Sequence, residues 1–476
     1  MIPRPAGVSP SNVSRLAEGE RSRHGGTACG QPAGRGMIPT SLASRLRSAV
    51  ALVQEGSLYA LLFLLPFSKA ALEITFGGLL VTWLFMRLDP KTRTHTLWLQ
   101  PQLRPLLAAA AAFLAACTLS LLASTDPALS FRGLTRKWLE YLVLFIIVTD
   151  VGSRPGVARR SLGVLAASAC LVIFEGVTQE RFGYGFFRNY RLDFFRRMTG
   201  PYESPIDLAT YLMVIIPPLV VYTFLHRGVA RWRMAVLTLA VISCLARAAS
   251  IGAWLGLGVG LVVMSRWRTA LPRHARAVLA VALVMAGTFL VMTGRLSRVF
   301  STSDVGKQDR WAMWQSALRM TWDRPILGQG VNTFMANYLR YWVGGQQQPR
   351  YAHNCYLQMG AETGVIGLGT FLWLCWCLVG LWRRAMRWML SRDPPDFLLM
   401  GWTAGLTAFL VQAAVDTNFY SLRQAFLFWT LAGIATGLAA RNAAQPSPSF
   451  ALRASERPRP SSIERVGAPY GGLQNA

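Results

Sequence analysis

The chain has 476 residues, of which 53% are hydrophobic and only 15% are charged. A soluble globular protein carries about 25% charged residues, so this composition argues against a soluble fold. The apolar residues form continuous blocks of about 17–25, the length that a helix needs to cross a bilayer. Continuous blocks favour helices over the alternating strands of a membrane β-barrel. We therefore expect an all-α polytopic membrane protein.

The formal net charge is +27, and a strongly positive charge is common among proteins that bind nucleic acid. Most of the Lys and Arg residues, however, fall in the tails and in the loops between apolar blocks. The positive-inside rule explains this distribution, because cytoplasmic loops of membrane proteins are rich in Lys and Arg. We therefore expect membrane lipids, and no nucleic acid, among the partners.

Twelve apolar blocks predict about twelve membrane-spanning helices. In chain order they lie near 48–66, 69–87, 105–123, 137–151, 161–178, 206–225, 232–246, 249–265, 277–293, 356–382, 397–415 and 421–440. A turn between the seventh and eighth blocks is inferred, because 232–267 would otherwise form one overlong span.

Basic residues fall in alternate loops, and this pattern predicts the orientation. If both termini are cytoplasmic, all of these loops lie on the cytoplasmic side. They contain Arg87, Lys91, Arg93, Arg104, Arg154, Arg159, Arg160, Arg227, Arg231, Arg233, Arg266, Arg268, Arg273, Arg276, Arg383, Arg384, Arg387 and Arg392. The agreement favours an even number of spans.

The outer side then has two longer segments, 179–205 and 294–355, besides short turns such as 124–136. The second segment has about sixty residues, far more than a usual connection between helices. Both segments are basic, against the positive-inside trend. An anionic ligand on the outer side would explain their charge.

Both ends of the sequence are Pro-, Ser- and Arg-rich, and we expect them to be disordered. The N-terminal tail lacks the apolar core of a signal peptide, and we expect Met37 to be the true initiator. The expected organisation is a tail at 1–44, helices at 45–293, the outer loop at 294–355, helices at 356–440 and a cytoplasmic tail at 441–476.

The seven cysteines show neither metal-ligand spacing nor a disulfide framework. The sequence also lacks a Walker loop, a dinucleotide fingerprint and an HExxH motif. We therefore expect no metal and no nucleotide cofactor.

Of the five histidines, only His353 falls in a predicted outer segment. It stands where the basic loop meets the tenth block. An imidazole with an ordinary pKa of about 6.5 can accept a proton from a sugar hydroxyl near neutral pH. The structural alternative is that His353 and Asn354 only cap the following helix.

Arg310 stands in the same loop, between Asp309 and Trp311. Arginine grips phosphate oxygens with two parallel hydrogen bonds. Residues 309–322 have helical spacing, which predicts an amphipathic helix on the outer leaflet. One face of it would carry Trp311, Trp314, Leu318 and Trp322. These tryptophans suit either an interfacial anchor or a sugar-stacking surface.

Arg247 stands between the seventh and eighth blocks, where a charge is costly and often functional. The alternative is that its side chain extends to the outer interface.

Glycines at spacings of four follow in the eighth block, at Gly252, Gly256 and Gly260. They predict a close-packing helix face. Gly360 and Gly364 in the tenth block are interpreted in the same way.

Several strings occur together in a definite order. They are Asp309-Arg310-Trp311, Arg324-Pro325-Ile326-Leu327-Gly328-Gln329-Gly330, His353-Asn354-Cys355-Tyr356-Leu357-Gln358 and Glu362-Thr363-Gly364-Val365-Ile366-Gly367, preceded by Gly200-Pro201-Tyr202-Glu203-Ser204-Pro205 before a span. This ordered set resembles the O-antigen ligase and polymerase superfamily. The resemblance covers about residues 45–440, and it rests on the order rather than on any one string.

The resemblance implies a bacterial inner-membrane, GT-C-like, inverting glycosyltransferase that needs no metal and no nucleotide. Its donor would be a glycan on undecaprenyl pyrophosphate. Its acceptor would be a lipid A-core sugar for a ligase, or another glycan for a polymerase. The resemblance also implies that His353 activates the acceptor hydroxyl and that Arg310 holds the pyrophosphate.

The sequence departs from the family at one position. The family's Ser-Arg-Gly corresponds to Ser250-Ile251-Gly252, so the arginine is missing at Ile251. Arg247 lies one helical turn earlier and is our candidate replacement for binding a phosphate. Weaker candidates near the outer side are Asn354, Glu203, Asp207, Asp416 and Arg136.

A transporter or flippase of lipid-linked sugars is the alternative from another class. Such a protein should line a path open to both sides with charge, whereas these spans are poor in charge. The sequence does not separate a ligase from a polymerase, since both need the same donor and the same base.

Overall fold

The computed structural model describes residues 42–88, 97–193, 195–266, 305–345, 347–391 and 397–443. By its internal contacts the chain divides into two units, Met1–Arg45 and Leu46–Ala476, and the architecture below is that of the second. The expected span at 277–293, the first part of the outer loop and most of both tails, including Met37, lie outside the described residues.

The described residues are mainly helical, with one isolated β-bridge between Tyr184 and Arg191. The helices are α1 (Leu42–Leu64), α2 (Lys69–Leu88), α4 (Arg104–Leu122), α5 (Pro127–Gly133), α6 (Glu140–Gly152), α7 (Val157–Phe182), α8 (Pro205–Leu225), α9 (Gly228–Ala248), α10 (Ile251–Ser265), α13 (Val305–Asp323), α14 (Phe334–Asn337), α15 (Cys355–Leu390), α16 (Leu398–Gln412) and α17 (Leu422–Ala443). Each predicted block within the described residues coincides with a helix. The total of twelve spans stays a prediction.

Six helical segments of the described part are long and apolar enough to cross a membrane. They are Lys69–Leu88, Pro101–Leu122, Val157–Phe182, Pro205–Leu225, Gly228–Ala248 and Cys355–Leu390. The apolar helices α10 and α16 are shorter. These findings agree with an all-α membrane protein.

The fourth predicted block is longer than expected. Its helix begins at Pro127, because the Asp126 side chain accepts a hydrogen bond from the amide of Leu129 at 2.9 Å and caps the first turn. α5 then continues through a π-helical segment, Leu134–Leu139, into α6. The short turn predicted at 124–136 is therefore mostly helix.

A seam of glycines joins α10 to α16. A Cβ added at Gly256 would lie 2.6 Å from the carbonyl oxygen of Ala408, and one added at Gly260 would lie 2.6 Å from that of Ala404. The two backbones therefore approach too closely for any larger residue. The predicted close-packing face is confirmed.

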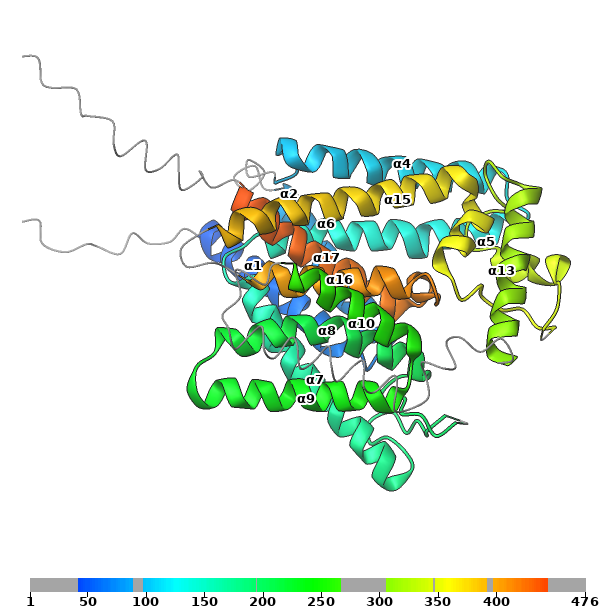
Figure 1. Cartoon of the computed structure of the whole chain (residues 1–476). Coiled ribbons are helices and arrows are strands. Elements are labelled where there is room, and N and C mark those ends of the chain that lie inside the picture. Colours follow the sequence, from blue (N-terminus) through cyan, green and yellow to red (C-terminus); the bar gives the residue numbers. More distant parts are fainter. Residues whose placement is uncertain are drawn as a thin grey trace, which may run out of the picture. The chain divides into compact units, whose positions relative to one another are not determined.

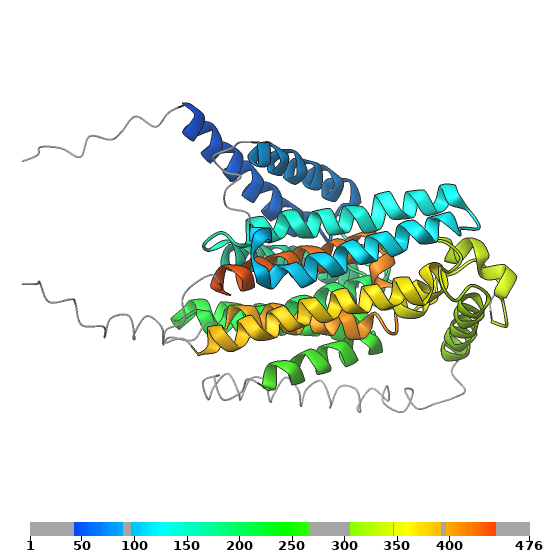
Figure 2. The same ribbon diagram turned by 90° about the horizontal axis from the view of Figure 1, so that it is seen from above.

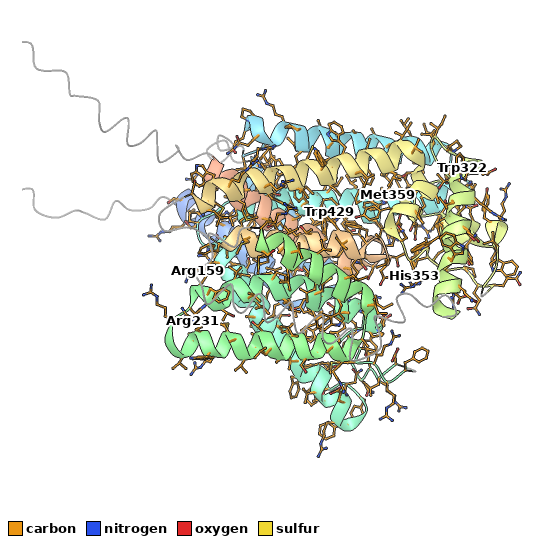
Figure 3. All side chains as sticks on the ribbon, viewed as in Figure 1. Arg159, Arg231, Trp322, His353, Met359 and Trp429 are labelled. Atoms are coloured by element: carbon orange, nitrogen blue, oxygen red, sulfur yellow. The ribbon has the colours of Figure 1, made fainter. Side chains whose placement is uncertain are left out.

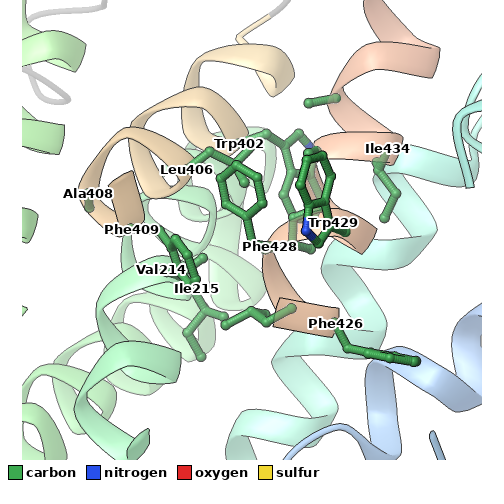
Figure 4. Close-up of a cluster of buried hydrophobic side chains, with 14 of the residues drawn as sticks. Val214, Ile215, Trp402, Leu406, Ala408, Phe409, Phe426, Phe428, Trp429 and Ile434 are labelled. Carbon is green, nitrogen blue, oxygen red and sulfur yellow. The ribbon is translucent and has the colours of Figure 1, made fainter. Parts of the chain in front are cut away.

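Aromatic side chains fill the core beside this seam. Phe428 packs against Phe409 with ring centroids 4.9 Å apart and against Trp429 with centroids 5.1 Å apart (Figure 4). The cluster joins α16 to α17, and α17 in turn packs along α6. Such buried aromatic contacts stabilise the packing of α16 against α17.

The prediction for Gly360 and Gly364 is wrong. A Cβ at Gly360 would meet nothing closer than 3.6 Å. Gly364 has φ 66° and ψ −170°, so it breaks α15, and a Cβ there would lie 2.2 Å from the carbonyl oxygen of Ile326. The close partner of Gly364 is thus the backbone of a loop, not a helix.

The helices of this unit run between two ends with different side chains. α4, α6 and α15 lie side by side, and α13 crosses one end of them (Figures 1 and 2). Arg159 and Arg231, which the charge pattern assigns to the cytoplasm, lie at the end opposite His353 and Trp322 (Figure 3). The arrangement therefore separates these basic segments from the predicted site.

Gly256→Val should destabilise the protein by about 1–3 kcal/mol, because the added side chain would overlap the backbone of α16. Gly258 gives a matched control on the same helix, since a Cβ there meets nothing within 4 Å. Thermal unfolding of both valine variants in detergent checks the seam. Equal midpoints for the two variants would contradict it.

Candidate functional site

Three segments that are far apart in the sequence meet at one end of α15. His353 lies two residues before the start of α15, Arg310 lies on α13, and Asp416 lies in the turn between α16 and α17. The Nδ1 atom of His353 is 3.2 Å from Oδ1 of Asp416. An Nη1 atom of Arg310 donates to the carbonyl oxygen of Val415 at 3.3 Å. The two main predicted residues, His353 and Arg310, therefore converge on Val415 and Asp416.

The carboxylate of Asp416 is well oriented to hold the His353 ring. Its Oδ1 atom also accepts a hydrogen bond from the amide of Thr417 at 2.8 Å, and its backbone carbonyl accepts one from the Sγ of Cys355 at 3.1 Å. A carboxylate that accepts from Nδ1–H keeps the neutral ring in the tautomer whose Nε2 is an acceptor. Nε2 of His353 is then available as a base, and its side chain is about one-third exposed.

Among the residues that the structure describes, Arg310 makes one hydrogen bond and keeps further donors for a ligand. A guanidinium has five N–H groups, and Val415 accepts from only one nitrogen of Arg310. The neighbouring Asp309 forms an ion pair with Arg350 at 3.5 Å, which joins the start of α13 to the segment before His353. This pair links helix α13 to the segment that carries His353.

Asn354 has the structural role that the sequence allowed. Its side chain accepts hydrogen bonds from the amides of Tyr356 and Leu357, both at 3.0 Å, and caps α15. His353, one residue earlier, has a positive φ of 48°. A residue with a Cβ adopts this conformation only where its surroundings hold it there.

Helix α13 has one buried and one exposed face. Met313, Ala317 and Met320 are buried against Phe334 and Tyr338. The exposed side includes Trp311, Leu318 and Trp322. The helix is thus amphipathic, with its two exposed tryptophans about three turns apart.

Residues 325–330 lie along the broken turn of α15. The amide of Val365 donates to the carbonyl of Pro325 at 2.8 Å, and the amide of Gly330 donates to that of Glu362 at 2.9 Å. Gly328 has φ 70°, and a Cβ there would lie 2.4 Å from the carbonyl carbon of Glu362. The string that looked like an isolated turn in the sequence therefore docks the outer loop onto α15.

Glu203 belongs to a separate group of charges. It lies 3.4 Å from Nζ of Lys69 and 3.7 Å from Nη2 of Arg423. Burial raises the pKa of the Glu203 carboxyl, but Lys69, Arg423 and the hydroxyl of Tyr190 outweigh burial, and the pKa is lowered. Glu203 is therefore a carboxylate at neutral pH and is poorly suited to donate protons.

Asp207 lies in the first turn of α8 and is half-buried. It is within electrostatic range of both Asp416 and Arg423. Its backbone carbonyl accepts a hydrogen bond from Nε2 of Gln424 at 2.9 Å. Asp207 thus connects the group around Glu203 to the Asp416 side of the site.

Arg247 and Arg136 interact with other partners. Arg247 is 60% exposed at the end of α9, and its Nε atom is paired with Glu180. Arg136 is exposed on the π-helical segment and is within electrostatic range of Glu140. Within the described residues, neither arginine is joined to His353 by a hydrogen bond or an ion pair.

Residues 232–372 match a protein family described as O-Antigen ligase. The match over these residues supports a resemblance to the O-antigen ligase superfamily. The resemblance found in the sequence is confirmed. The matched region contains Arg247, Arg310 and His353, whereas Asp416 lies beyond it. No curated protein matches the chain.

The match to the O-antigen ligase family supports a membrane enzyme that transfers glycosyl groups, of the ligase or polymerase type. It also supports a glycan and a lipid-linked substrate in general. The two-ended arrangement of charges and the apolar helices agree with this membrane function.

Sequence reasoning did not single out two residues around this O-antigen ligase-like site, Glu362 and Arg423. Glu362 is buried, and its Oε2 accepts from the amide of Asn332 at 2.7 Å. Lys137 donates to Oδ1 of the same Asn332 at 2.7 Å. Arg423 is only 2% exposed and donates to the carbonyl oxygens of Pro66 and Pro201. Their signal was a charge inside an apolar block, which is costly unless it has partners.

Proposed function

We propose that the chain transfers a glycan from undecaprenyl pyrophosphate to a sugar hydroxyl, with inversion at the anomeric carbon. We place the reaction at the periplasmic face of a bacterial inner membrane, with both termini cytoplasmic. The pairing of His353 with Asp416, beside Arg310, carries the proposal. The acceptor is a lipid A-core sugar, as in an O-antigen ligase.

His353 acts as the general base in this proposal. Its Nε2 takes the proton of the acceptor hydroxyl as the oxygen attacks the anomeric carbon. Asp416, on Nδ1, stabilises the imidazolium that forms. The bond between the anomeric carbon and the pyrophosphate oxygen breaks, and its electron pair leaves with undecaprenyl pyrophosphate. The proton on His353 then passes to water or to the leaving phosphate.

Arg310 binds the pyrophosphate. Charge grows on the phosphate oxygens as the glycosidic bond breaks, and a preorganised guanidinium stabilises that charge. Arg247 is the second proposed phosphate ligand. Its Nε is paired with Glu180, and its two terminal nitrogens carry four further N–H groups. Since the lipid pyrophosphate is already an activated leaving group, neither a metal nor a nucleotide is required.

A polymerase of the same superfamily is the nearest alternative. It would use the same donor and base but would extend another glycan. Glycan profiles of a deletion strain on gels separate the two. Loss of long glycan from lipid A-core, while polymer still forms on the carrier lipid, supports a ligase. Loss of chain length alone supports a polymerase.

A flippase, the alternative from another class, receives less support. His353, Asp416 and Arg310 lie together at one end of the helices, as a reaction at one face requires. If the protein were a flippase, a strain that lacks it would present no donor at the outer face. Donor supplied directly to purified protein in vesicles therefore distinguishes this alternative, because an enzyme still transfers the glycan.

His353→Ala should reduce transfer by about 10²–10⁴-fold, because the general base is removed. Asp416→Asn should give a smaller loss, because the base remains but its favoured tautomer changes. His226→Ala is the matched control, since His226 lies after α8 and bonds the carbonyl of Tyr222 at 2.9 Å. Rates with purified variants check this, and full transfer by His353→Ala would refute the mechanism.

Arg310→Ala should lower kcat/KM for the donor by about 10–100-fold, and Arg310→Lys should restore only part of it, because lysine lacks the planar fork. Arg319→Ala on the exposed side of α13 is the control and should transfer normally. The measurement is the initial rate at varied donor concentration. Similar rates for the alanine variants at 310 and 319 would remove Arg310 from the site.

Arg247→Ala should raise the KM for the donor by about 3–10-fold, with a smaller effect on kcat, if it holds a phosphate in the ground state. Arg181→Ala, an exposed arginine at the end of α7, provides the comparison. Normal transfer with normal expression of Arg247→Ala would exclude Arg247 as the replacement for the arginine missing at Ile251.

A further inference from the structure

A buried chain of hydrogen bonds leads from the outer loop to His353. Oε1 of Glu362 accepts from Nε2 of Gln358 at 3.0 Å, and Oε1 of Gln358 accepts from the amide of Ala352 at 3.2 Å. Ala352 directly precedes His353. Glu362, Gln358 and Ala352 are all at most 1% exposed.

Glu362 determines how Gln358 is oriented. Both oxygens of Glu362 accept from N–H groups, and Gln358 turns its NH₂ group towards Glu362. The carbonyl oxygen of the Gln358 amide then faces the other way and accepts from Ala352. A neutral amide in place of the Glu362 carboxylate would remove this constraint, because an amide can present either end.

The same carboxylate also holds the outer loop. Its Oε2 accepts from the amide of Asn332 at 2.7 Å, and its Oε1 lies 3.4 Å from the amide of Phe334. The Asn332 side chain is held in turn by Lys137 at 2.7 Å. Asn332 has a positive φ of 63°, a left-handed conformation that is uncommon for residues other than glycine.

A buried carboxylate is costly, and an apolar residue would often stabilise a core better. Glu362 is hydrogen-bonded on both oxygens, and Lys137 is the charged side chain that interacts with it electrostatically. The group joins two strained backbone positions, Asn332 and His353. Strain of this kind persists only where the surroundings determine it, and it is concentrated at functional sites.

We propose that Glu362 is a positioning residue, which acts through Gln358 and the amide of Ala352 to hold His353 in its left-handed conformation against Asp416. Glu362 touches no substrate in this role. The inference rests on the proposed function, because it assigns Glu362 to the placement of the base. It also makes the docking of the loop at Asn332 and the placement of His353 depend on one side chain.

Exchanging the two residues tests the proposal. Glu362→Gln leaves two amides facing each other, and Gln358→Glu leaves two carboxylates facing each other. Each single variant should lower kcat by about 10–100-fold, because a displacement of about 1 Å at the base has that effect. The KM for the donor should change by less than about threefold, because Arg310 is untouched.

The double variant Glu362→Gln/Gln358→Glu restores one carboxylate and one amide. The carboxylate, now at position 358, would accept from the amide of Ala352 and from the new side-chain amide at position 362. The oxygen of that new amide would still accept from Asn332. We expect kcat to recover to within about fivefold of the original chain, as coupled neighbours show in double-mutant cycles. Thr370→Val on α15 is the control for substitution in this helix.

The outcomes separate the two levels of the argument. Transfer by the original chain, loss in His353→Ala, loss of kcat in both single variants and recovery in the double variant support the positioning role. Unchanged kcat in both single variants overturns it and leaves the proposed function intact. Single losses without recovery, or losses confined to KM, also overturn it. An original chain that transfers no glycan, with donor and acceptor supplied, overturns the proposed function and this role together.

Discussion

α15 is interrupted at Gly364, and an interrupted helix leaves backbone amides and carbonyls that need partners away from water. Residues 325–330 provide those partners, through the pairs Val365 with Pro325 and Gly330 with Glu362. This backbone pairing fixes the described part of the outer loop onto the helix that follows it. Because α13 precedes the paired segment, the pairing also brings Arg310 to the end of α15 where His353 lies.

The candidate site combines side chains from three segments: the residues just before α15, helix α13 and the turn after α16. His353 and Arg310 lie within the segment matched to the O-antigen ligase family, while Asp416, which pairs with His353, follows α16 and lies beyond it. A ring nitrogen, a carboxylate and a guanidinium at one face suit the activation of a hydroxyl beside an anionic leaving group. The packed helices therefore fix the positions of their ends, and the candidate site residues lie at or near those ends.

Much of the helical architecture was predictable from the sequence. Apolar block length located the helices, because a bilayer imposes that length. Spacing of four located the seam of Gly256 and Gly260, because small residues on one helix face have few other uses. The break at Gly364 was missed, since the same glycine fits a helix face and a positive φ equally well in sequence.

The candidate site was predictable only in part. His353 and Arg310 were found from their chemistry and their side of the membrane. Asp416 ranked low, because nothing local shows that the turn after α16 folds back to a residue 63 positions earlier. Glu362 was quoted only as part of a string, since hydrogen bonds to Gln358 and Asn332 depend on tertiary contacts.

The glycine seam also has a geometric effect at the site. A Cβ on Gly252, the first glycine of the series, would lie 2.8 Å from Cγ2 of Val415, whose carbonyl accepts from Arg310. One residue of sliding between α10 and α16 would move Val415 by about 1.5 Å along the helix axis. That is enough to break a 3.3 Å hydrogen bond. The axial alignment of α10 with α16 thus affects the position of Arg310 relative to His353 along the helix axes, although neither helix contains Arg310 or His353.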